Sequence, residues 1–372
     1  MRTAIGLMTG TSIDGIDAAA VRVVGSGLAL RAELLAHEHA PLGALAATLR
    51  ALACGERMTA AEISAAALAL GRLHADLASR LAQRVGPPDL VAAHGQTVFH
   101  APPRSFQLLS PAPIADALRC PVVYDLRAAD LAAGGQGAPI TPVADFVFFR
   151  DPAQARAVVN LGGFCNVTLL PPRAERDEGA WLGAVRGRDI CACNHVLDAA
   201  ARRALGKPFD DGGAGAFRGA PDPNAVRDLR DALGAQSRIA RSLGSGDESL
   251  AWIERHADGL APDNLLASAA SAVGEAIGAA LRDFRPDLVL VAGGGTRNRA
   301  LVGHIQRAVG APVQPTDEFG VPVGAREAAA MAVLGALCAD GVPITLPAVT
   351  GVRSPAPVSG AWMNAPALLR RD

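Results

Sequence analysis

Two segments of the same kind, roughly 150 residues apart, constrain most strongly what this chain can fold into. In each of them an apolar run enters a glycine-containing turn, and a second apolar run leaves it. The first covers Thr3–Val24 with its turn at Thr9–Ser12, and the second covers Ala157–Leu170 with its turn at Gly162-Gly163. We therefore expect a β-hairpin in each half of the chain. Two such hairpins indicate a duplicated α/β architecture with a cleft between its halves, although two unrelated hairpins would give the same pattern.

The remaining segments alternate between helical and strand patterns. Apolar residues at helical spacing predict helices over residues 60–85, 196–205, 265–284 and 323–339. Short apolar runs predict buried strands over residues 89–93 and 287–292. Such alternation is typical of an α/β fold with a mostly parallel or mixed sheet.

The length of 372 residues predicts two domains, because one domain usually takes about 150 residues. We expect an N-terminal domain of residues 1–137 plus about 345–372, which carries the first glycine hairpin, and a C-terminal domain of residues 138–344. The glycine-rich segment Ala133–Pro139 is the candidate hinge between them. The segment Pro171–Arg188 is expected to form an exposed, charged loop.

Charge and composition argue against several classes of protein. Lys+Arg 35 against Asp+Glu 36 gives a net charge of -1, so the chain has no basic surplus for nucleic acid. No uninterrupted apolar stretch reaches the length of a membrane span, and the N-terminus lacks the pattern of a signal peptide. Most of the six cysteines stand alone, and Cys191-x-Cys193 lacks the spacing of a zinc site. We expect a reduced, cytoplasmic protein with no structural metal, nucleic-acid partner or membrane segment.

The first glycine turn is a candidate phosphate-binding segment. Backbone N–H groups in a tight glycine turn can point at a phosphate, and small hydroxyl residues add donors. Asp14 and Asp17 could hold Mg²⁺ directly or through water. An ordinary turn fits the same residues. The chain has no G-x4-G-K-[ST] motif, which excludes a Walker-type phosphate loop.

A second glycine-rich segment, Gly293–Gly295, follows a predicted strand and precedes a helix. Asn298 stands where the third glycine of a dinucleotide fingerprint would be, so that fingerprint is not supported. Three glycines would still let the backbone approach a flat ligand such as adenosine. A plain strand-to-helix turn fits as well.

One acidic residue, Asp189, is a candidate general base. It precedes the helix predicted from residue 196, and we expect it at or just before the helix N-terminus. The helix dipole would keep a carboxylate ionised there, as a base must be. A carboxylate that only caps the helix is the alternative.

Further polar side chains stand near predicted strand and helix ends. His94–Thr97 follows a buried strand, where open α/β sheets place ligand groups, although His94 could also be a core residue. Asp125, Arg127 and Asp130 could form an ion pair or clamp a substrate. Glu327 is expected near the start of the last helix, where an acid pairs with the helix dipole on a solvated face.

Taken together, these segments resemble the anhydro-N-acetylmuramic acid kinases, a bacterial family of the sugar kinase, Hsp70 and actin superfamily. Gly6–Asp17 resembles the family's G-x-M-S/T-G-T-S-x-D-G-x-D opening, and Asn160–Thr168 resembles its N-x-G-G-x-x-N-x-T hairpin. The other matching segments follow in the family's order: His94–Thr97, Asp125, Arg127, Asp130–Pro139, Gly293–Asn298, Thr316–Gly320, Glu327-Ala328 and Leu346–Gly351.

The resemblance implies a duplicated, two-domain α/β fold of the sugar kinase, Hsp70 and actin type (ribonuclease H-like) with an interdomain cleft. It implies that ATP, Mg²⁺ and water are used to open 1,6-anhydro-N-acetylmuramic acid and phosphorylate its O6. The product would be N-acetylmuramic acid 6-phosphate, in cell-wall recycling. The implied partners are this anhydro-amino sugar, ATP and a second copy of the chain in a cytoplasmic homodimer.

The resemblance also implies roles for individual residues. The catalytic residues would be Asp189, as the base that activates water, and Glu327. The implied ATP-binding residues are Gly10, Thr11, Ser12, Asp14, Gly15, Asp17, Gly162, Gly163, Asn166, Gly293, Gly294, Gly295 and Asn298. The implied substrate-binding residues are His94, Gln96, Asp125, Gln136 and Asn194. The C-terminal domain would then carry both the nucleotide site and the catalytic aspartate.

This chain departs from the family pattern directly after Asp189, where Ile190–Cys193 replaces Thr-Gly-Pro-Gly. The added Cβ atoms are expected to restrict backbone conformations with positive φ. The segment Leu108–Pro111 also lacks a glycine that the family has. Two alternatives therefore stay open: a kinase of a different sugar or anhydro-sugar, and a nucleotide-binding pseudoenzyme.

Overall fold

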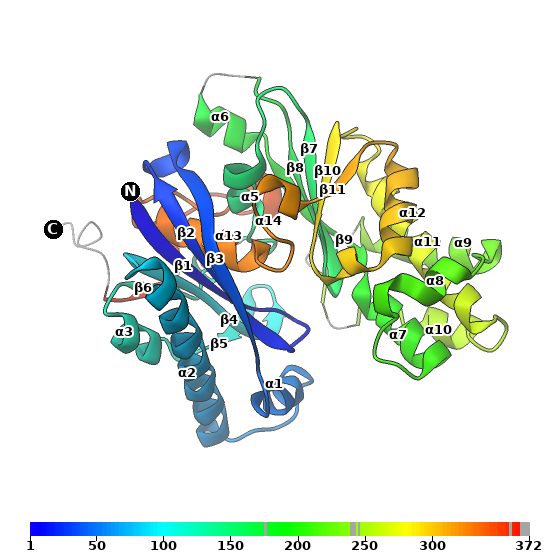
Figure 1. Ribbon diagram of the computed structural model, residues 1–372, viewed down its shortest axis with the longest axis horizontal. Coiled ribbons are helices and arrows are strands. Elements are labelled where there is room, and N and C mark those ends of the chain that lie inside the picture. The colour runs from blue at the N-terminus through cyan, green and yellow to red at the C-terminus, as the bar shows by residue number, and fades with distance from the viewer. Residues whose placement is uncertain (175–176, 239–242, 245, 357–358, 365–372) are drawn as a thin grey trace. The chain divides into compact units, whose positions relative to one another are not determined.

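The computed structural model divides the chain into two compact units (Figure 1). Unit 1 comprises Met1–Phe148, Glu175–Val185 and Gly324–Asp372, and unit 2 comprises Phe149–Ala174 and Arg186–Val323. The structure describes residues 1–174, 177–238, 243–244, 246–356 and 359–364.

Unit 1 is built on a mixed sheet with the strand order β12-β6-β4-β1-β2-β3, and β5 pairs with β4. Its strands are β1 (Arg2–Thr9), β2 (Gly15–Val24), β3 (Arg31–Pro41), β4 (Leu90–Ala101), β5 (Arg104–Leu108), β6 (Val122–Tyr124) and β12 (Ala361–Met363). β1 pairs antiparallel with β2 and parallel with β4. The first predicted hairpin is therefore confirmed as β1–β2.

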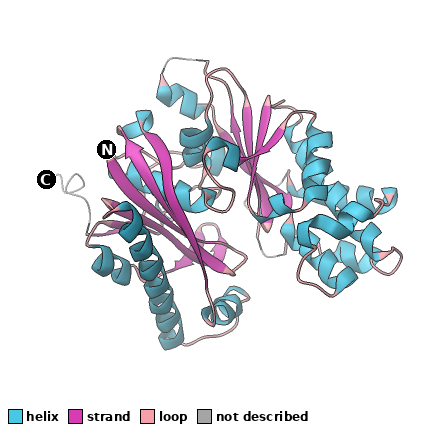
Figure 2. Ribbon diagram, viewed as in Figure 1, coloured by secondary structure: helices cyan, strands magenta, loops and turns pink. Residues whose placement is uncertain are grey.

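Helices pack on both faces of the unit 1 sheet because side chains alternate along β1 (Figure 2). Ile5 and Leu7 belong to the core formed with α2, whereas Gly6 meets α13. A Cβ on Gly6 would lie 1.8 Å from the carbonyl oxygen of Ala328, so only glycine lets α13 pack this closely. The helices of this unit are α1 (Leu45–Ala53), α2 (Ala60–Val85), α3 (Ala112–Leu118), α4 (Ala128–Ala132), α5 (Pro142–Phe149), α6 (Glu178–Gly183), α13 (Arg326–Ala339) and α14 (Pro347–Thr350), with the short 3-10 turn η1 (Gly27–Ala29).

Unit 2 has a mixed sheet with the strand order β11-β10-β7-β8-β9. Its strands are β7 (Arg156–Leu161), β8 (Phe164–Leu170), β9 (Arg186–Ala192), β10 (Leu288–Ala292) and β11 (Val313–Pro315). Its helices are α7 (Asn194–Leu205), α8 (Ala214–Arg218), α9 (Pro223–Gln236), α10 (Ala251–His256), α11 (Pro262–Leu281) and α12 (Arg299–Val309). Three 3-10 turns join them: η2 (Asp211–Gly213), η3 (Gly294–Arg297) and η4 (Thr316–Phe319). β7–β8 is the second predicted hairpin.

The two sheets repeat one arrangement, which confirms the predicted duplicated α/β fold. On one side, β1 pairs antiparallel with β2, and β2 pairs antiparallel with β3. In the same way, β7 pairs antiparallel with β8, and β8 with β9. On the other side, β4 and then β6 follow β1 as parallel strands, and β10 and then β11 follow β7.

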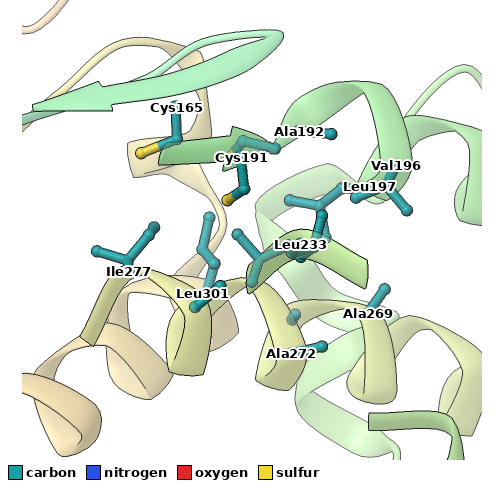
Figure 3. Packing of buried hydrophobic residues seen from close by; sticks show 14 of the residues in the cluster. Cys165, Cys191, Ala192, Val196, Leu197, Leu233, Ala269, Ala272, Ile277 and Leu301 are labelled. Atoms are coloured by element: carbon teal, nitrogen blue, oxygen red, sulfur yellow. The ribbon is translucent and has the colours of Figure 1, made fainter. Parts of the chain in front are cut away.

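Small residues allow close helix packing in the core of unit 2 (Figure 3). At Gly274 and Gly278 of α11, a Cβ would lie 2.6 Å and 2.5 Å from the Cβ atoms of His304 and Ala308 on α12. The close approach of α11 and α12 therefore depends on these two glycines.

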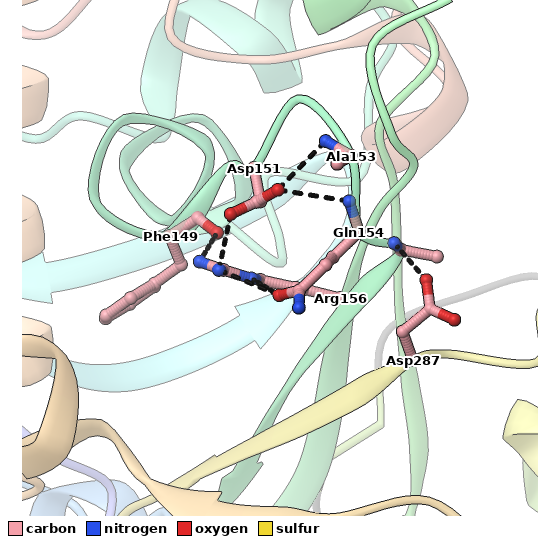
Figure 4. Close-up of polar contacts among 7 residues, drawn as sticks. Phe149, Asp151, Ala153, Gln154, Arg156 and Asp287 are labelled. Atoms are coloured by element: carbon pink, nitrogen blue, oxygen red, sulfur yellow. Dashed lines mark hydrogen bonds and ion pairs between the residues drawn. The ribbon is translucent and has the colours of Figure 1, made fainter.

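Polar contacts fix the start of β7, the strand that leads to the second glycine turn (Figure 4). Arg156 donates to the carboxylate of Asp151 at 2.6 Å and to the carbonyl oxygen of Phe149 at 3.1 Å. The backbone N–H of Ala155 donates to Asp287 Oδ2 at 2.8 Å, just before β10. The Arg156 bonds hold the segment before β7, and the bond to Asp287 ties β7 to its parallel neighbour β10.

Several predicted elements are confirmed, and two need correction. The helix over residues 60–85 is α2, and the other three predicted helices are α7, α11 and α13. The strand predicted over residues 89–93 continues to Ala101 as β4, so His94–Thr97 lie inside a strand. The segment predicted as an exposed loop contains α6, which buries Trp181 and Leu182, and the start of β9.

The compact units differ in their bounds from the predicted domains. Residues 138–148, 175–185 and 324–344 belong to unit 1, whereas the prediction placed them in the C-terminal domain. The physical reason is packing, since α13 lies against β1, β2 and β4 of the unit 1 sheet.

Among the described residues, α11 is the helix whose length and composition would suffice to cross a membrane. Within the structure, 78% of its most apolar window is buried. The same helix supplies Leu265, Ala269 and Ile277 to the core of unit 2.

Candidate active site

The second glycine turn is held by the first residues of α7. The backbone N–H of Asn194 donates to the carbonyl oxygen of Gly162 at 3.0 Å, and that of Cys193 donates to Gly163 at 2.8 Å. A Cβ on Gly163 would lie 2.5 Å from Nε2 of His195. The turn between β7 and β8 is therefore fixed against the N-terminus of α7, and Gly163 has no room for a side chain.

The glycines after β10 reach the same place in unit 2. A Cβ on Gly295 would lie 2.7 Å from the Cβ of Leu161 and 3.0 Å from Asn194 Oδ1. Gly293 has a φ of +84°, and a Cβ there would lie 2.8 Å from Asn160 Oδ1. The Asn194 Nδ2 group donates to the carbonyl oxygen of Leu161 at 3.1 Å. Unit 2 thus brings together two glycine segments and Asn194, which were predicted separately from the sequence.

Asn298 has a structural task in the same region. Its Oδ1 accepts from the N–H of Leu301 at 3.0 Å and caps α12. A Cβ on Gly213 would lie 2.1 Å from this oxygen, so η2 packs directly against the cap. Asn298 remains a predicted nucleotide ligand, and it also fixes the helix that follows the glycines.

The sequence analysis missed Asp210, which organises the turn containing Gly213. Its two carboxylate oxygens accept from the N–H groups of Gly215 and Ala216, each at 2.8 Å. Two acids followed by two glycines, Asp210–Gly213, are a signal for such a turn, and it could have been found.

Asp189 does not lie at a helix start, and the prediction of its position was wrong. It lies inside β9, in register with Asn166 of β8, and α7 begins only at Asn194. The N–H of Leu243 donates to its Oδ2 at 2.8 Å. A backbone N–H rather than a helix dipole therefore stabilises this carboxylate.

The cysteines after Asp189 belong to the core of unit 2 (Figure 3). Cys191 and Cys193 are fully buried, and burial raises the pKa of both thiols. Cys193 has a φ of −126°, so its Cβ causes no left-handed strain. We expected the added Cβ atoms to restrict positive φ angles. At Cys193 this restriction has no effect, because the backbone there does not adopt the conformation that favours glycine.

In unit 1, His94 holds an arginine in place. Its Nε2 accepts from Arg127 Nε at 2.9 Å, so its Nδ1–H donates to the carbonyl oxygen of Gly95 at 3.0 Å. Burial and then the Arg127 charge lower the pKa of His94 to about 3, which keeps the ring neutral. Arg127 also donates to the carbonyl oxygen of Gly137 at 2.8 Å.

The same network reaches two more of the segments singled out in the sequence. Asp130 Oδ2 accepts from the N–H of Gly137 at 2.7 Å, and its Oδ1 accepts from the hydroxyl of Thr350 at 2.7 Å. The N–H of Gln136 donates to the carbonyl oxygen of Thr350 at 2.8 Å. Gln96 is buried on β4, the strand that also carries His94, and its Nε2 donates to the carbonyl oxygen of Thr97.

The first glycine turn, Gly10–Asp14, exposes Thr11 and Ser12 between β1 and β2. Ser12 donates to Asp14 Oδ1 at 2.8 Å, and Asp17 Oδ1 contacts His39 Nδ1 at 2.8 Å. A Cβ on Gly15 would lie 2.1 Å from the His39 ring, so this residue has to be glycine.

Glu327 lies in the first turn of α13 and is half-buried, which corrects the expectation of a solvated face. Burial is the main cause that raises its pKa, and the charge of Asp17 adds to this. Arg326 and Arg127 act in the opposite direction. The charge of Asp17 in the first glycine hairpin and that of Arg127 therefore both act on Glu327.

The sequence analysis also missed the residue before it. Arg326 and Asp145 are each 1% exposed and form a two-pronged ion pair, with Arg326 Nε donating to Asp145 Oδ1 at 2.9 Å. Arg326 also donates to the hydroxyl of Thr141 at 3.2 Å. This pair joins α5 to the start of α13 and so fixes the position of Glu327.

Two units with the same hairpin-centred sheet, each with a glycine turn after its first strand, define the class of protein. This is a duplicated α/β fold in which each half carries its own glycine turn. The family model for anhydro-N-acetylmuramic acid kinase matches residues 2–364.

Curated relatives agree with this match. The anhydro-N-acetylmuramic acid kinase of Salinibacter ruber is 34% identical, over 98% of this chain and 97% of its own length. That of Bordetella pertussis is 39% identical, over 95% of this chain and 94% of its own length. A solved ROK family glucokinase from Streptomyces griseus, in complex with glucose and AMPPNP, has a TM-score of 0.35 and 16% identity, over 90% of this chain and 99% of that chain. This chain belongs to the anhydro-N-acetylmuramic acid kinase family.

Proposed function

We propose that this protein uses ATP and water to convert 1,6-anhydro-N-acetylmuramic acid into N-acetylmuramic acid 6-phosphate and ADP. The observation that carries the proposal is the family match over residues 2–364. The resemblance assigns the roles of Asp189, Asn194 and Glu327. The reaction would serve the recycling of cell-wall sugars.

In the proposed reaction, the water oxygen bonds to the anomeric carbon as the bond from that carbon to O6 breaks. O6 then bonds to the γ-phosphorus of ATP, whose bond to the bridging oxygen breaks and leaves ADP. Asp189 accepts the proton that water loses. The hydrogen bond from Leu243 supports this role, because a base must be held in one orientation.

Unit 2 is the proposed nucleotide-binding unit. Gly162 and Gly163 are proposed to lie against the phosphates, and Gly293–Gly295 against the adenosine. The close packing of Gly293 and Gly295 on Leu161, and of Gly163 on His195, supports the proposal, because it holds both glycine segments on a fixed scaffold. Asn166 and Asn298 are proposed as further contacts of the nucleotide.

Unit 1 is proposed to contribute the first glycine turn, Gly10–Asp17, and the second catalytic carboxylate, Glu327. His94, Gln96, Asp125 and Gln136, together with Asn194 of unit 2, are proposed for the sugar. Because His94 is only 2% exposed and bonds to Arg127, we propose that it acts by positioning that arginine.

Mg²⁺ is proposed to accompany ATP. Among the described residues no group of three or more His, Cys, Asp or Glu side chains is placed to hold a metal ion. Mg²⁺ is usually held by nucleotide phosphates with one or two carboxylates, and Asp17 and Glu327 are proposed for this role. When bound, the ion would neutralise charge on the transferred phosphoryl group.

A cytoplasmic location and a homodimer are also proposed, and the family resemblance supports both. A kinase with a different sugar has less support, since the cysteines that suggested it are buried in the core of unit 2.

The test is ADP release with and without 1,6-anhydro-N-acetylmuramic acid, followed in a coupled assay. We expect ADP release to require this sugar. Binding of ATP in a thermal-shift assay, with no sugar-dependent ADP release, would instead support a nucleotide-binding pseudoenzyme.

A further inference from the structure

Unit 1 has an open cavity beside the network of His94 and Arg127. Its volume is about 490 Å³, which lies in the range of about 300–1,000 Å³ that small-molecule sites occupy. The cavity is lined by Arg104 and Ser105 of the β4–β5 hairpin, by Asp125 after β6, and by residues of α4. It is therefore large enough for one monosaccharide.

The cavity wall carries opposite charges on two different elements. Asp125 has a φ of +51°, a conformation that side chains other than glycine rarely adopt, and burial raises its pKa. Arg104 forms no ion pair with a carboxylate among the described residues, and its guanidinium lies 5.6 Å from the ring centre of Phe99. The ring holds the guanidinium by a cation–π contact, which leaves its N–H groups available to an anionic ligand.

The β4–β5 hairpin has more buried polar atoms than partners. Ser105 Oγ accepts from Gln107 Nε2 at 2.7 Å and contacts His100 Nδ1 at 2.9 Å. His100 Nε2 and Gln107 Oε1 are buried and have no hydrogen-bond partner in the described part of the chain. Buried polar atoms are normally satisfied, so an ordered water is expected beside these two atoms, which lie behind Ser105 and do not line the cavity themselves.

We propose that this cavity receives the lactyl and acetamido side of the amino sugar. Arg104 pairs with the lactyl carboxylate, and Asp125 accepts a hydrogen bond from an N–H or hydroxyl group of the sugar. The inference rests on the proposed function, whose substrate has one carboxylate and several hydrogen-bond donors. A cavity with one cation and one carboxylate matches that set of groups.

Arg104 then determines specificity for the free acid. Conversion of the lactyl carboxylate to its primary amide removes the charge and changes the shape little. The guanidinium would lose its charged partner, and the acid should therefore be preferred over the amide. The amide is disfavoured because it leaves the Arg104 guanidinium without a charged partner.

The experiment compares Arg104→Gln and Arg104→Lys with the wild type on two substrates, the free acid and its lactyl amide. The matched control is Arg119→Gln, which removes an exposed arginine that pairs with the exposed Asp116. Each protein is assayed for kcat/KM by ADP release and for sugar binding by calorimetry.

We expect Arg104→Gln to lower kcat/KM for the acid by roughly tenfold or more and to leave the amide nearly unchanged. Arg104→Lys should keep part of the preference, and Arg119→Gln all of it. Equal losses on both substrates, or no loss on either, would overturn the inference while leaving the proposed function intact.

Calorimetry separates the two proposals. If the wild type binds the acid, and Arg104→Gln weakens only that binding, the site stands even when no ADP is released. If the wild type neither binds nor turns over the acid, both proposals fail.

Discussion

Replacement of Arg326 by methionine should destabilise unit 1 more than any surface substitution. The side chain is 1% exposed, and so is its partner Asp145. Arg326→Met keeps most of the aliphatic volume but removes the guanidinium from a buried carboxylate. Removal of one partner of a buried ion pair costs about 3–5 kcal/mol. That is a large part of the ~5–15 kcal/mol by which a protein is stable.

The double variant Arg326→Met with Asp145→Leu provides the internal comparison. It removes both charges, and replacement of a whole buried pair by apolar residues is often neutral or stabilising. Thr141 still loses the bond that Arg326 donates at 3.2 Å, so we expect recovery of most of the stability but not all. Arg22→Met serves as the exposed control, because Arg22 and Glu33 are 41% and 66% exposed. It should cost less than about 1 kcal/mol.

Urea denaturation followed by circular dichroism measures all three variants and the wild type. We expect Arg326→Met to shift the midpoint far below that of the wild type and the double variant to restore most of it. Because Glu327 is the next residue, Arg326→Met should also reduce turnover under conditions where the protein is folded. A stability of Arg326→Met within about 1 kcal/mol of the wild type would refute the reasoning, since the expected loss is about 3–5 kcal/mol.

Three further predictions concern other parts of the molecule. Asp189→Asn should lower kcat by about 100- to 10,000-fold with little change in the KM for ATP, and unchanged turnover would reject it as the base. Gly295→Ala should raise the KM for ATP, because the new Cβ would lie 2.7 Å from Leu161, whereas Gly234→Ala, with nothing within 4 Å, should not. The pKa of buried His74 is about 3 against an ordinary 6.5, so the unfolded chain binds more protons below pH 6.5 and stability falls as the pH drops towards 3. His74→Phe should reduce that fall by up to about 1.4 kcal/mol per pH unit in urea titrations, and an unchanged slope would contradict a neutral His74.

Sequence patterns predicted those helices and hairpins that depend mainly on interactions between residues near each other in the chain. Helix α2 has the predicted bounds, because its apolar spacing begins at a capping box between Thr59 and Glu62. Both glycine hairpins were found because glycine turns between apolar runs have few other solutions.

Asp189 shows where local reasoning fails. Strand β9 alternates poorly, with arginines at positions 186 and 188, and its sequence did not predict a strand. It forms because β8 offers an edge for pairing, which is a contact between segments distant in the chain. The bond from Leu243 to Asp189 spans 54 positions and left no signal in the sequence spacing.

The polar networks of unit 1 could not be predicted either, because they also join residues that are distant in the chain. The bond from Arg326 to Asp145 spans 181 positions, and that from Thr350 to Asp130 spans 220. Each residue was visible as a charge or hydroxyl, but pairing depends on the completed fold. Burial of Glu327 likewise depends on α13 packing against the unit 1 sheet, which its own helix pattern does not specify.

The central claim is that one turnover adds both water and a phosphoryl group to an anhydro-sugar. Mass spectrometry of the sugar after incubation with ATP, Mg²⁺ and 1,6-anhydro-N-acetylmuramic acid tests it most directly, with ADP measured in the same sample. The account predicts a product heavier by one water and one phosphoryl group, formed in equal amount to ADP. A phosphorylated sugar that keeps its anhydro bridge, or ADP formed without any sugar phosphate, would contradict it.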